Sequence, residues 1–343
     1  MEKFKITSYE DISKKEWDES VSNLNGCRWK STSNQIEYYC NLSKTENISF
    51  LIKDESKNVI SIVPLALHKD KTKSFSFGGT PCSKPLLQKK IDASRRRKIL
   101  LFIKETIEIM AKKNNVKKYI VDSHPVVYLE ESNIPQISSK NQFDLNFWTG
   151  KIALHNTLIV ECSKSLIELE DNLSKYRKRD IKRSLKKLEI KSYNYKCDHE
   201  KLNRIFANYK NCHFKKAKVT RPDKSWQIMK ERIIDNQATL FVSYLNKSTE
   251  ISYLYCGHYE KFAWGWSQVN DLNYEKEFQP RHSLEWEAIN YFKKNNFLFY
   301  DIGERYNIAQ NFLPTLKQLS ISDFKEKYGT ALFPKPVYEF EFR

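Results

Sequence analysis

Four apolar runs and one helical pattern follow one another between residues 238 and 302, and their order decides the fold. They read ATLFVSY (238–244), ISYLYCGH (251–258), FAWGWSQ (262–268), SLEWEAINYFKK (283–294) and FLFYDI (297–302). Short runs rich in β-branched and aromatic residues are typical of strands, whereas the apolar residues of 283–294 recur at helical spacing. Three consecutive strands, a helix and a further strand predict a mixed α/β sheet with a helix packed on it.

The remainder of the chain also alternates between helical and strand patterns. We expect further strands at 48–52, 59–65, 119–122 and 157–160, and helices at 95–112, 166–188, 199–216 and 223–234. The tail 340–342 alternates like an edge strand. The region 130–156 contains Asn, Ser, Gln and Pro and is the best domain boundary, and 343 residues suggest two domains.

The chain is strongly basic, with 59 Lys and Arg against 42 Asp and Glu and a net charge of +17. Such an excess attracts polyanions, which include nucleic acid, anionic lipid headgroups and pyrophosphate-linked substrates. Part of it lies in the expected helix 166–188, where Arg177, Lys178, Lys182 and Arg183 are candidate nucleic-acid-binding residues. The same run also fits a solvated helix face or contact with anionic lipid, and the sequence leaves these alternatives open.

Several classes of protein are excluded by what the sequence lacks. Its eight glycines form neither GxGxxG nor GxxxxGK[ST], the motifs of dinucleotide-binding and P-loop proteins. The seven cysteines form no CxxC pair and the histidines are dispersed, so we predict no metal site. No apolar run approaches the roughly 18 residues of a membrane span, and the N-terminus lacks a signal-peptide core, so we expect a cytoplasmic protein with reduced thiols.

Four segments of the second half resemble the Fem-type (FemABX-like) peptidyltransferases, a tandem branch of the GNAT acyltransferase superfamily. They are the basic run 173–183, VTRP (219–222), WGWS (264–267) with QPRHSLEWEAI (279–289), and YDIG (300–303) with SDFKEKYG (322–329). The first half matches more weakly, at 33–35 and 78–81. The order and spacing of the four segments are fairly specific, and the resemblance spans nearly the whole chain.

The resemblance implies an α/β fold of two GNAT-like (acyl-CoA N-acyltransferase) domains in tandem. The first would comprise residues 1–153 with 323–343, whose last strand returns to it, and the second 154–322, with the basic helix and the active-site cleft. The family transfers an aminoacyl group from aminoacyl-tRNA to an amine of a peptidoglycan precursor, and related tandem proteins use acyl-CoA. Either donor would be a co-substrate, with no permanently bound cofactor.

The resemblance also implies roles for individual residues. Lys325 matches the lysine of the family's Phe-Lys signature, near the acyl transfer, and Asp122 lies near a carboxylate considered as a general base. Both are therefore catalytic candidates. Arg221 matches a position that binds substrate phosphate, and Trp264 and Trp266 stand where the family often has tyrosines lining the cleft. The change to tryptophan removes any role of the tyrosine hydroxyls.

Two further residues of the matched segments, Arg281 and Asp301, are candidate substrate-binding residues. Asp301 also suits a structural role, in which it bonds backbone amides near Gly303. The superfamily binds the pyrophosphate of CoA in a glycine-rich turn, but no glycine occurs in 279–283. This departure weakens an ordinary acetyl-CoA interpretation without excluding it.

Acylation of an amine requires a base for the amine proton and donors for the developing oxyanion, and Lys325 can serve as such a donor or bind a phosphate. We therefore expect an acyltransferase that moves an aminoacyl or acyl group onto an amine of a phosphate-bearing cell-envelope precursor, for peptidoglycan or surface glycan. It would work in the cytoplasm or at the inner face of the membrane. Two alternatives stay open: an acyl-CoA-dependent N-acyltransferase of a nucleotide sugar or polysaccharide, and a non-catalytic RNA- or membrane-binding module.

Overall fold

The computed structural model describes residues 3–70, 73–129, 134–138, 144–146, 148, 150–306, 314–328 and 331–342. The chain divides into two compact units, residues 1–155 with 334–343 and residues 156–333. The expected boundary differs at one important place, because 323–333 lie in the second unit. Helix α11 (Leu316–Glu326), which carries Lys325, packs against strand β18 (Phe299–Arg305) of that unit. Gly329, which ends the fourth matched segment, lies outside the described residues.

Among its described residues, the first unit contains two larger sheets, a two-stranded hairpin and four α-helices. One sheet has the order β1 (Lys5–Ser8), β4 (Phe50–Lys53), β5 (Val59–Val63), β9 (Leu86–Gln88), β2 (Leu24–Asn25). In the other, β3 (Glu46–Asn47), β6 (Ala66–His68), β7 (Ser74–Phe75), β10 (Lys118–Asp122) and β19 (Ala331–Glu341) are consecutive neighbours, and β8 (Cys82–Ser83) also pairs with β10. A small hairpin joins β11 (Val126–Tyr128) to β12 (Pro135–Ile137). The helices are α1 (Lys14–Ser22), α2 (Arg28–Ser31), α3 (Ser33–Ser43) and α4 (Ala93–Asn114).

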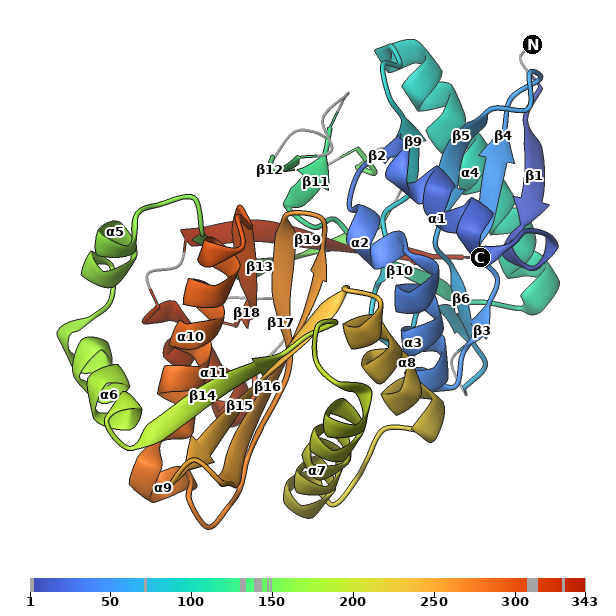
Figure 1. Cartoon of the computed structure of the whole chain (residues 1–343). Coiled ribbons are helices and arrows are strands. Elements are labelled where there is room, and N and C mark those ends of the chain that lie inside the picture. Colours follow the sequence, from blue (N-terminus) through green and yellow to red (C-terminus); the bar gives the residue numbers. More distant parts are fainter. Residues whose placement is uncertain are drawn as a thin grey trace. The chain divides into compact units, whose positions relative to one another are not determined.

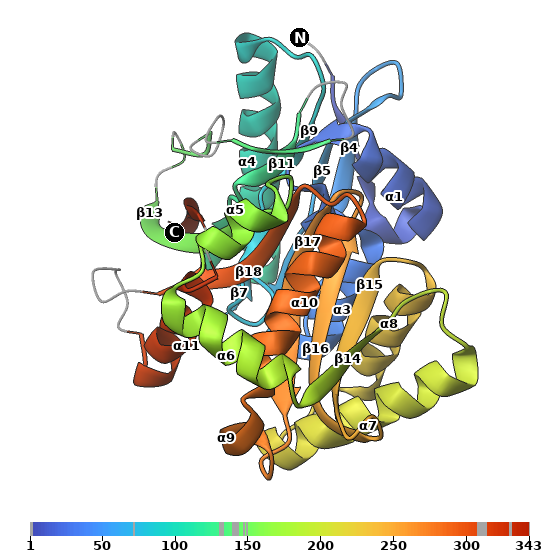
Figure 2. The same cartoon turned by 60° about the vertical axis from the view of Figure 1, so that its left-hand side comes forward.

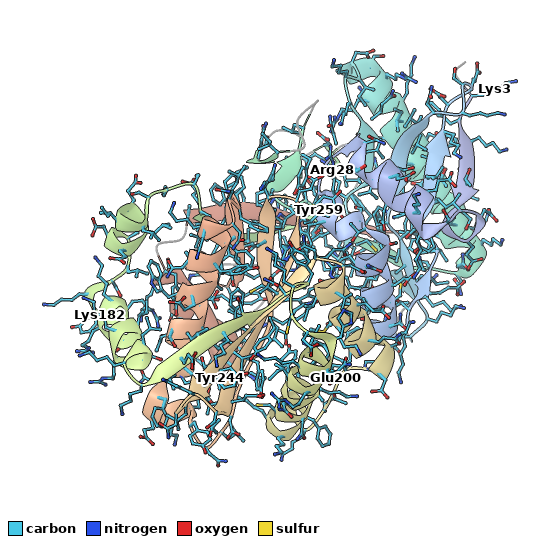
Figure 3. The ribbon with its side chains drawn as sticks, viewed as in Figure 1. Lys3, Arg28, Lys182, Glu200, Tyr244 and Tyr259 are labelled. Atoms are coloured by element: carbon cyan, nitrogen blue, oxygen red, sulfur yellow. The ribbon has the colours of Figure 1, made fainter. Side chains whose placement is uncertain are left out.

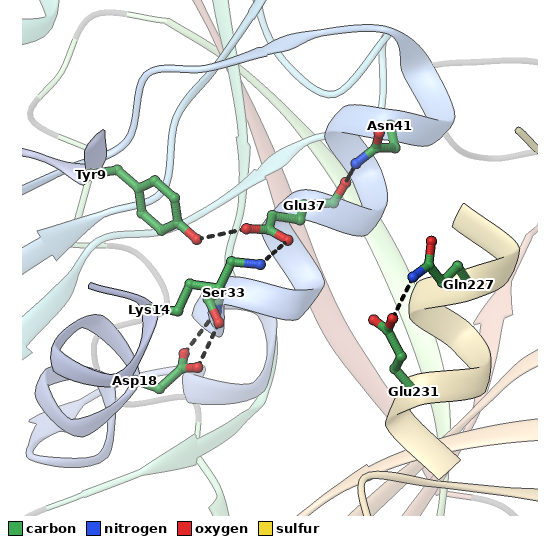
Figure 4. A network of polar contacts seen from close by, with 8 residues as sticks. All are labelled: Tyr9, Lys14, Asp18, Ser33, Glu37, Asn41, Gln227 and Glu231. Carbon is green, nitrogen blue, oxygen red and sulfur yellow. Dashed lines mark hydrogen bonds and ion pairs between the residues drawn. The ribbon is translucent and has the colours of Figure 1, made fainter. Parts of the chain in front are cut away.

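Two polar junctions connect the N-terminal helices of this unit (Figure 4). The Asp18 carboxylate of α1 accepts hydrogen bonds from the backbone N and hydroxyl of Ser33, at 2.7 and 2.6 Å. Glu37 of α3 accepts from the Tyr9 hydroxyl at 3.2 Å and from Lys14 Nζ at 2.6 Å. Ser33 is the first residue of α3, so its bonds to Asp18 satisfy helix-end groups that would otherwise be left without a partner.

The C-terminal strand β19 is longer than the alternation at 340–342 indicates. It pairs antiparallel with β10, from Lys118 opposite Glu341 to Asp122 opposite Val337. Two prolines, Pro334 and Pro336, lie inside β19 and hide it from a pattern search, because proline lacks the N–H that a strand ladder uses.

The second unit is built on one mixed sheet with helices on both faces. Its order is β14 (Leu188–Tyr193), β15 (Ala238–Leu245), β16 (Thr249–Tyr259), β17 (Phe262–Asn270), β18, β13 (Lys151–Glu161), and only the β17–β18 pair of this series is parallel. Helix α10 (Pro280–Lys294) covers one face, and α7 (His199–Ala217) and α8 (Asp223–Ile234) cover the other (Figure 1). A short helix, α9 (Glu275–Phe278), precedes α10.

The helix expected over 166–188 is in fact two helices. They are α5 (Leu166–Asp171) and α6 (Lys175–Leu185), and both lie in front of the sheet in Figure 2, with α6 packed on α10. Serines begin each of them: the Ser165 hydroxyl accepts from the Glu168 amide, and the Ser174 hydroxyl accepts from the Arg177 amide. An N-cap serine accepts, through its side chain, a hydrogen bond from a backbone N–H of the first helical turn that has no partner within the helix. Ser174 therefore starts a new helix. None of the described helices combines the length and the apolar character needed to cross a bilayer.

Candidate active site

Lys325 lies in the last turn of α11 with its ammonium against the backbone of β18. The position it meets is Gly303, which has φ +116, a conformation that favours glycine. A Cβ atom built at Gly303 would overlap Lys325 Nζ. Glycine at 303 therefore serves both the backbone bend and the close approach of the lysine.

The charges around Lys325 come from two elements. Asp301 and Glu304 of β18 and Glu285 of α10 attract its ammonium, whereas Arg281 of α10 repels it. Burial is the largest influence, and it lowers the pKa of Lys325 below the ordinary value. Lys325 Nζ forms no hydrogen bond or ion pair with any residue in the described part of the chain. The ammonium is therefore able to bond an added ligand.

Asp301 supports the β18 backbone. Its Oδ1 accepts a hydrogen bond from the Thr157 hydroxyl at 2.7 Å and another from the Gly303 amide at 2.7 Å. The side chain is only 6% exposed. These contacts show the structural role weighed from the sequence, and direct substrate binding by Asp301 stays a prediction.

Glu285 is a buried carboxylate behind Lys325 that sequence patterns alone do not single out. Its Oε1 accepts a hydrogen bond from the Tyr300 hydroxyl at 2.6 Å, and that hydroxyl lies 3.5 Å from Cys256 Sγ. Burial raises the pKa of Glu285, although Tyr300, Arg281 and Lys325 oppose the shift. Glu285 lies in the apolar face of α10, where a pattern search treats it as an interruption of the core rather than as part of a site.

Arg177 is not on the exposed basic face, which corrects its assignment as a nucleic-acid contact. It is 4% exposed and belongs to the buried stripe of α6, with Ile181 and Ser184. Its guanidinium lies 4.5 Å from the Phe324 ring centroid and donates from Nη2 to the Phe324 carbonyl at 3.1 Å. The sequence alone could not show this burial, because a buried arginine within a run of cations looks the same as its solvent-facing neighbours.

The other three residues of the basic assignment remain near the surface. Lys182 and Arg183 are exposed, and Figure 3 shows Lys182 extending away from the sheet of its unit. Lys178 is partly exposed and forms an ion pair with Asp171 of α5 at 3.2 Å. Their binding to nucleic acid, lipid or water stays a prediction.

Arg221 lies between α7, α8 and β17, on the face opposite α10. Its Nη1 lies 3.0 Å from His213 Nε2, its Nη2 donates to the Ser267 hydroxyl at 2.9 Å, and its guanidinium is 4.8 Å from the Trp226 ring centroid. Burial, with a smaller contribution from Arg221, lowers the pKa of His213 to about 4. The imidazole is thus neutral near pH 7 and able to accept the Arg221 N–H. His213 is another site neighbour that the sequence did not indicate.

A β-bulge in β17 brings Ser267 onto the face that carries Arg221. Tyr255 is opposite Ser267 and Cys256 is opposite Gly265, which leaves Trp266 as the extra residue. Without the bulge, strict alternation would turn Trp266 and Ser267 to opposite faces. The bulge therefore supplies Arg221 with its hydroxyl partner.

The two tryptophans share one face of β17, where they pack against other side chains of the protein. Their ring centroids are 5.9 Å apart, and the Arg232 guanidinium lies 5.5 Å from Trp264 and 5.1 Å from Trp266. Trp264 is 5% exposed and covers Gly257 on the neighbouring strand, where a Cβ would overlap its ring. Core packing thus accounts for Trp264, and Trp266 is the more open of the pair.

Asp122 belongs to a buried ion cluster in the first unit. Its Oδ2 is bound by Lys30 Nζ of α2 and lies 3.8 Å from Lys335 Nζ of β19. The carboxylate is 2% exposed, and its Oδ1 has no hydrogen-bond partner among the described residues. The partners come from positions 92 residues before and 213 residues after it, so local patterns could not reveal them. A role of Asp122 as proton acceptor stays a prediction.

The N-terminus of α10 does not fit the pyrophosphate of CoA. A pyrophosphate cradle needs free backbone N–H groups, but Pro280 has none and the His282 amide donates to the Gln279 carbonyl at 3.1 Å. The Arg281 guanidinium and the His282 ring fill the space beside this turn, with centroid distances of 3.7 and 5.2 Å to Phe324. The residues present therefore disagree with a CoA site at this helix.

Comparison with known proteins identifies structures that share this architecture. No protein-family model matches the chain, and a search of curated protein sequences also gives no match. Solved structures do match. FemX superposes with a TM-score of 0.65 at 13% identity, over 98% of this chain and 97% of FemX. The C-terminal domain of a putative lysylphosphatidylglycerol synthetase from Agrobacterium fabrum gives 0.58 at 8% identity, over 95% and 92%. A tandem GNAT protein from the clavulanic acid biosynthesis pathway gives 0.55 at 9%, over 99% and 98%.

These matches establish the fold. The chain has a mixed α/β fold of the tandem GNAT type, similar to FemX over nearly its whole length. The fold class expected from the sequence is therefore confirmed, and the resemblance to the Fem-type proteins is confirmed at the level of the fold.

Proposed function

We propose that this protein is an acyltransferase that moves an aminoacyl group from aminoacyl-tRNA onto an amine of a cell-envelope precursor. The observation that carries the proposal is the position of Lys325. Its ammonium lies over Gly303 and makes no ion pair with a described residue. This arrangement occurs in a fold shared with FemX. A largely desolvated cation that forms no ion pair with a described residue is suited to stabilise a developing oxyanion.

The proposed reaction forms one C–N bond and breaks one C–O bond. The amine lone pair attacks the ester carbonyl of the aminoacyl-tRNA, and the carbonyl oxygen becomes an oxyanion. Lys325 donates an N–H to that oxygen and keeps its own proton. The intermediate then collapses, the ribose oxygen leaves with a proton, and the nitrogen loses one. Asp122 is the proposed acceptor of the amine proton.

Arg221 is proposed to bind a phosphate of the acceptor. A planar guanidinium can bond a phosphate through two N–H groups, and the Arg221 guanidinium is held by His213, Ser267 and Trp226. Trp266, Arg281 and Asp301 are the further proposed contacts. An acceptor with a lipid carrier would bring the protein to the inner face of the membrane, where Lys182 and Arg183 would face anionic headgroups or tRNA.

Aminoacyl-tRNA is the preferred donor because the α10 turn does not fit a CoA pyrophosphate. The alternative is an acyl-CoA-dependent N-acyltransferase of a nucleotide sugar or polysaccharide. Its support is the tandem GNAT protein of the clavulanic acid pathway, which has the same fold and whose structure is described as being without AcCoA.

The two donors can be separated in one assay. Total tRNA charged with radiolabelled amino acids, and in parallel radiolabelled acetyl-CoA, are incubated with the protein and a UDP-linked muramoyl peptide that has a free side-chain amine. We expect label to pass from tRNA to the peptide with wild-type protein and with Lys327→Ala, and to be lost with Lys325→Ala. Lys327 is the matched control because it is an exposed lysine two residues further on.

The remaining outcomes are equally informative. Transfer from acetyl-CoA alone would replace the proposal with the CoA-dependent alternative. Protection of RNA or sedimentation with anionic vesicles, without transfer from either donor, would favour the non-catalytic binding module. Transfer that survives Lys325→Ala would remove Lys325 from the reaction.

A further inference from the structure

Side chains from two other helices, α6 and α10, contact the last turn of α11. Phe324, the residue before Lys325, is contacted by two guanidinium groups: Arg281 at 3.7 Å and Arg177 at 4.5 Å from its ring centroid. Arg177 also lies 4.6 Å from the ring of Tyr328, one turn further along. Aromatic faces attract cations, and this attraction is stronger where water is excluded.

Hydrogen bonds complete these contacts. Arg177 Nη2 donates to the Phe324 carbonyl at 3.1 Å, and the Tyr328 hydroxyl donates to the His282 carbonyl of α10 at 3.2 Å. Arg177 Nη1 lies 3.4 Å from His282 Nε2. The Phe324 carbonyl is one of the last carbonyls of α11, which have no partner within the helix. Arg177 therefore acts at the point where an ordinary helix end frays.

Both arginines contact Phe324, the residue beside Lys325, and through it they can act on the position of the ammonium. Arg177 and Tyr328 are almost fully buried, at 4% and 0% exposure. Lysine could supply the charge at position 177, but not the planar group that stacks on two rings and donates to a carbonyl at the same time. The contacts of position 177 thus require arginine specifically. On a solvent-facing basic helix, lysine would serve equally well.

We propose that Arg177 and Arg281 are positioning residues: their contacts with Phe324, here called the clamp, hold Lys325 over Gly303. The inference rests on the proposed function for the claim that this position of Lys325 serves acyl transfer. The clamp itself is a statement about geometry and can be tested without any substrate.

The first test measures Lys325 directly. Trace acetylation with acetic anhydride over a range of pH, read by mass spectrometry, gives the reactivity and the midpoint of titration of Lys325. The groups that face Lys325 are Asp301 and Glu304 from β18 and Glu285 and Arg281 from α10. The variants are Arg177→Lys, Arg281→Lys and Phe324→Leu, which retains an apolar side chain in case either arginine variant fails to fold.

We expect each clamp variant to raise the midpoint of Lys325 toward that of an exposed lysine, because the freed ammonium becomes solvated. A rise of one pKa unit is a tenfold change in the free-amine fraction below the midpoint. The matched control is Arg179→Lys, since Arg179 is an exposed arginine on the same helix and lies 5.3 Å from the Tyr176 ring. The control should titrate as wild type. A wild-type midpoint and reactivity in folded clamp variants would overturn the clamp.

The second test is the transfer assay described above. We expect the clamp variants to lower kcat by about 10–100-fold with little change in KM for aminoacyl-tRNA, since small displacements of a reacting group have effects of this size. A changed midpoint with unchanged kcat would overturn the positioning role while leaving the proposed function intact. A changed midpoint in a protein whose wild type transfers nothing would leave the clamp standing and reject the proposed function.

Discussion

Both units hold lysine close to carboxylate in a largely buried setting, and the two sites differ in how the charges are paired. In the first unit, Asp122 is bound by Lys30 and lies within ion-pair distance of Lys335. In the second, Lys325 faces Asp301, Glu304 and Glu285 but forms no ion pair with a described residue. Ion pairs such as those of Asp122 contribute to the fold, whereas a cation held near carboxylates without an ion pair to a described residue is available for a ligand. The comparison distinguishes lysines that form ion pairs within the fold from one that is proposed to bind a ligand, on the basis of contacts rather than residue type.

The largest effect on stability is expected from Asp122→Asn. The change leaves two buried ammonium groups without their carboxylate, and breaking a buried ion pair by removing one partner costs about 3–5 kcal/mol. Chemical denaturation measures the free energy of unfolding. The control is Glu339→Gln, which breaks the more exposed pair with Lys118 at 3.4 Å and should cost no more than about 1 kcal/mol. Equal losses in the two variants would contradict the distinction between the clusters.

The opposite pattern is expected for Lys325→Met, which removes the charge but keeps an apolar stem. Loss of one oxyanion donor lowers kcat by about 10²–10³-fold. The free energy of unfolding should fall much less than in Asp122→Asn, because no ion pair with a described residue is broken. Transfer kinetics and denaturation of the same preparation give both quantities. A stability loss as large as that of Asp122→Asn would make Lys325 structural, and the contrast between the units would disappear.

Gly303→Ala sharpens the comparison, because it moves the lysine without removing it. Left-handed strain at a residue with a Cβ costs about 1–3 kcal/mol, and here the added methyl also overlaps Lys325 Nζ. Gly79→Ala is the matched control, since Gly79 has φ +91 but nothing within 4 Å of its Cβ position. We expect similar stability losses, measured by denaturation, and a fall in kcat for Gly303→Ala alone. A normal kcat for that variant would show that the contact of Lys325 with β18 has no part in transfer.

The last prediction concerns pH. Burial lowers the pKa of His213 to about 4, and of His258 to about 4, so the folded state binds their protons less readily than the unfolded chain. Both contributions are fully present above the unfolded pKa of about 6.5 and are lost as pH falls toward 4. We therefore expect the free energy of unfolding to decrease over this window. Denaturation of His213→Gln at several pH values should show a flatter profile, and an unchanged profile would remove His213 from it.

The sequence predicted the general architecture because its signals are local. Periodicity and capping residues give the elements of 238–302 and the helix α4, and the order of the matched segments gives the tandem fold. The error at 166–188 arose because Ser174 is a helix start that an unbroken apolar stripe conceals. Strand β19 was underestimated because its prolines weaken the pattern.

The sites were harder to predict because their contacts join distant residues. Lys325 was a candidate from its Phe-Lys context. The position of its ammonium, however, depends on Gly303 and on the contacts of Phe324 with Arg177, which is 148 residues away from Lys325. The sequence classed Arg177 with Lys182 and Arg183, and burial separates them. Likewise, no local pattern connects His213 to Arg221 or Lys335 to Asp122. These pairings appear only when the chain is folded.

The pairing of β10 with β19 has a consequence for synthesis. The first unit gains the strand next to β10 from residues that leave the ribosome more than 200 positions later. During translation, the edge of β10 that pairs with β19 therefore stays unpaired until the second unit has been synthesised. Such an edge can pair with other nascent chains, so the interval before β19 appears is the time at which this protein most needs a chaperone.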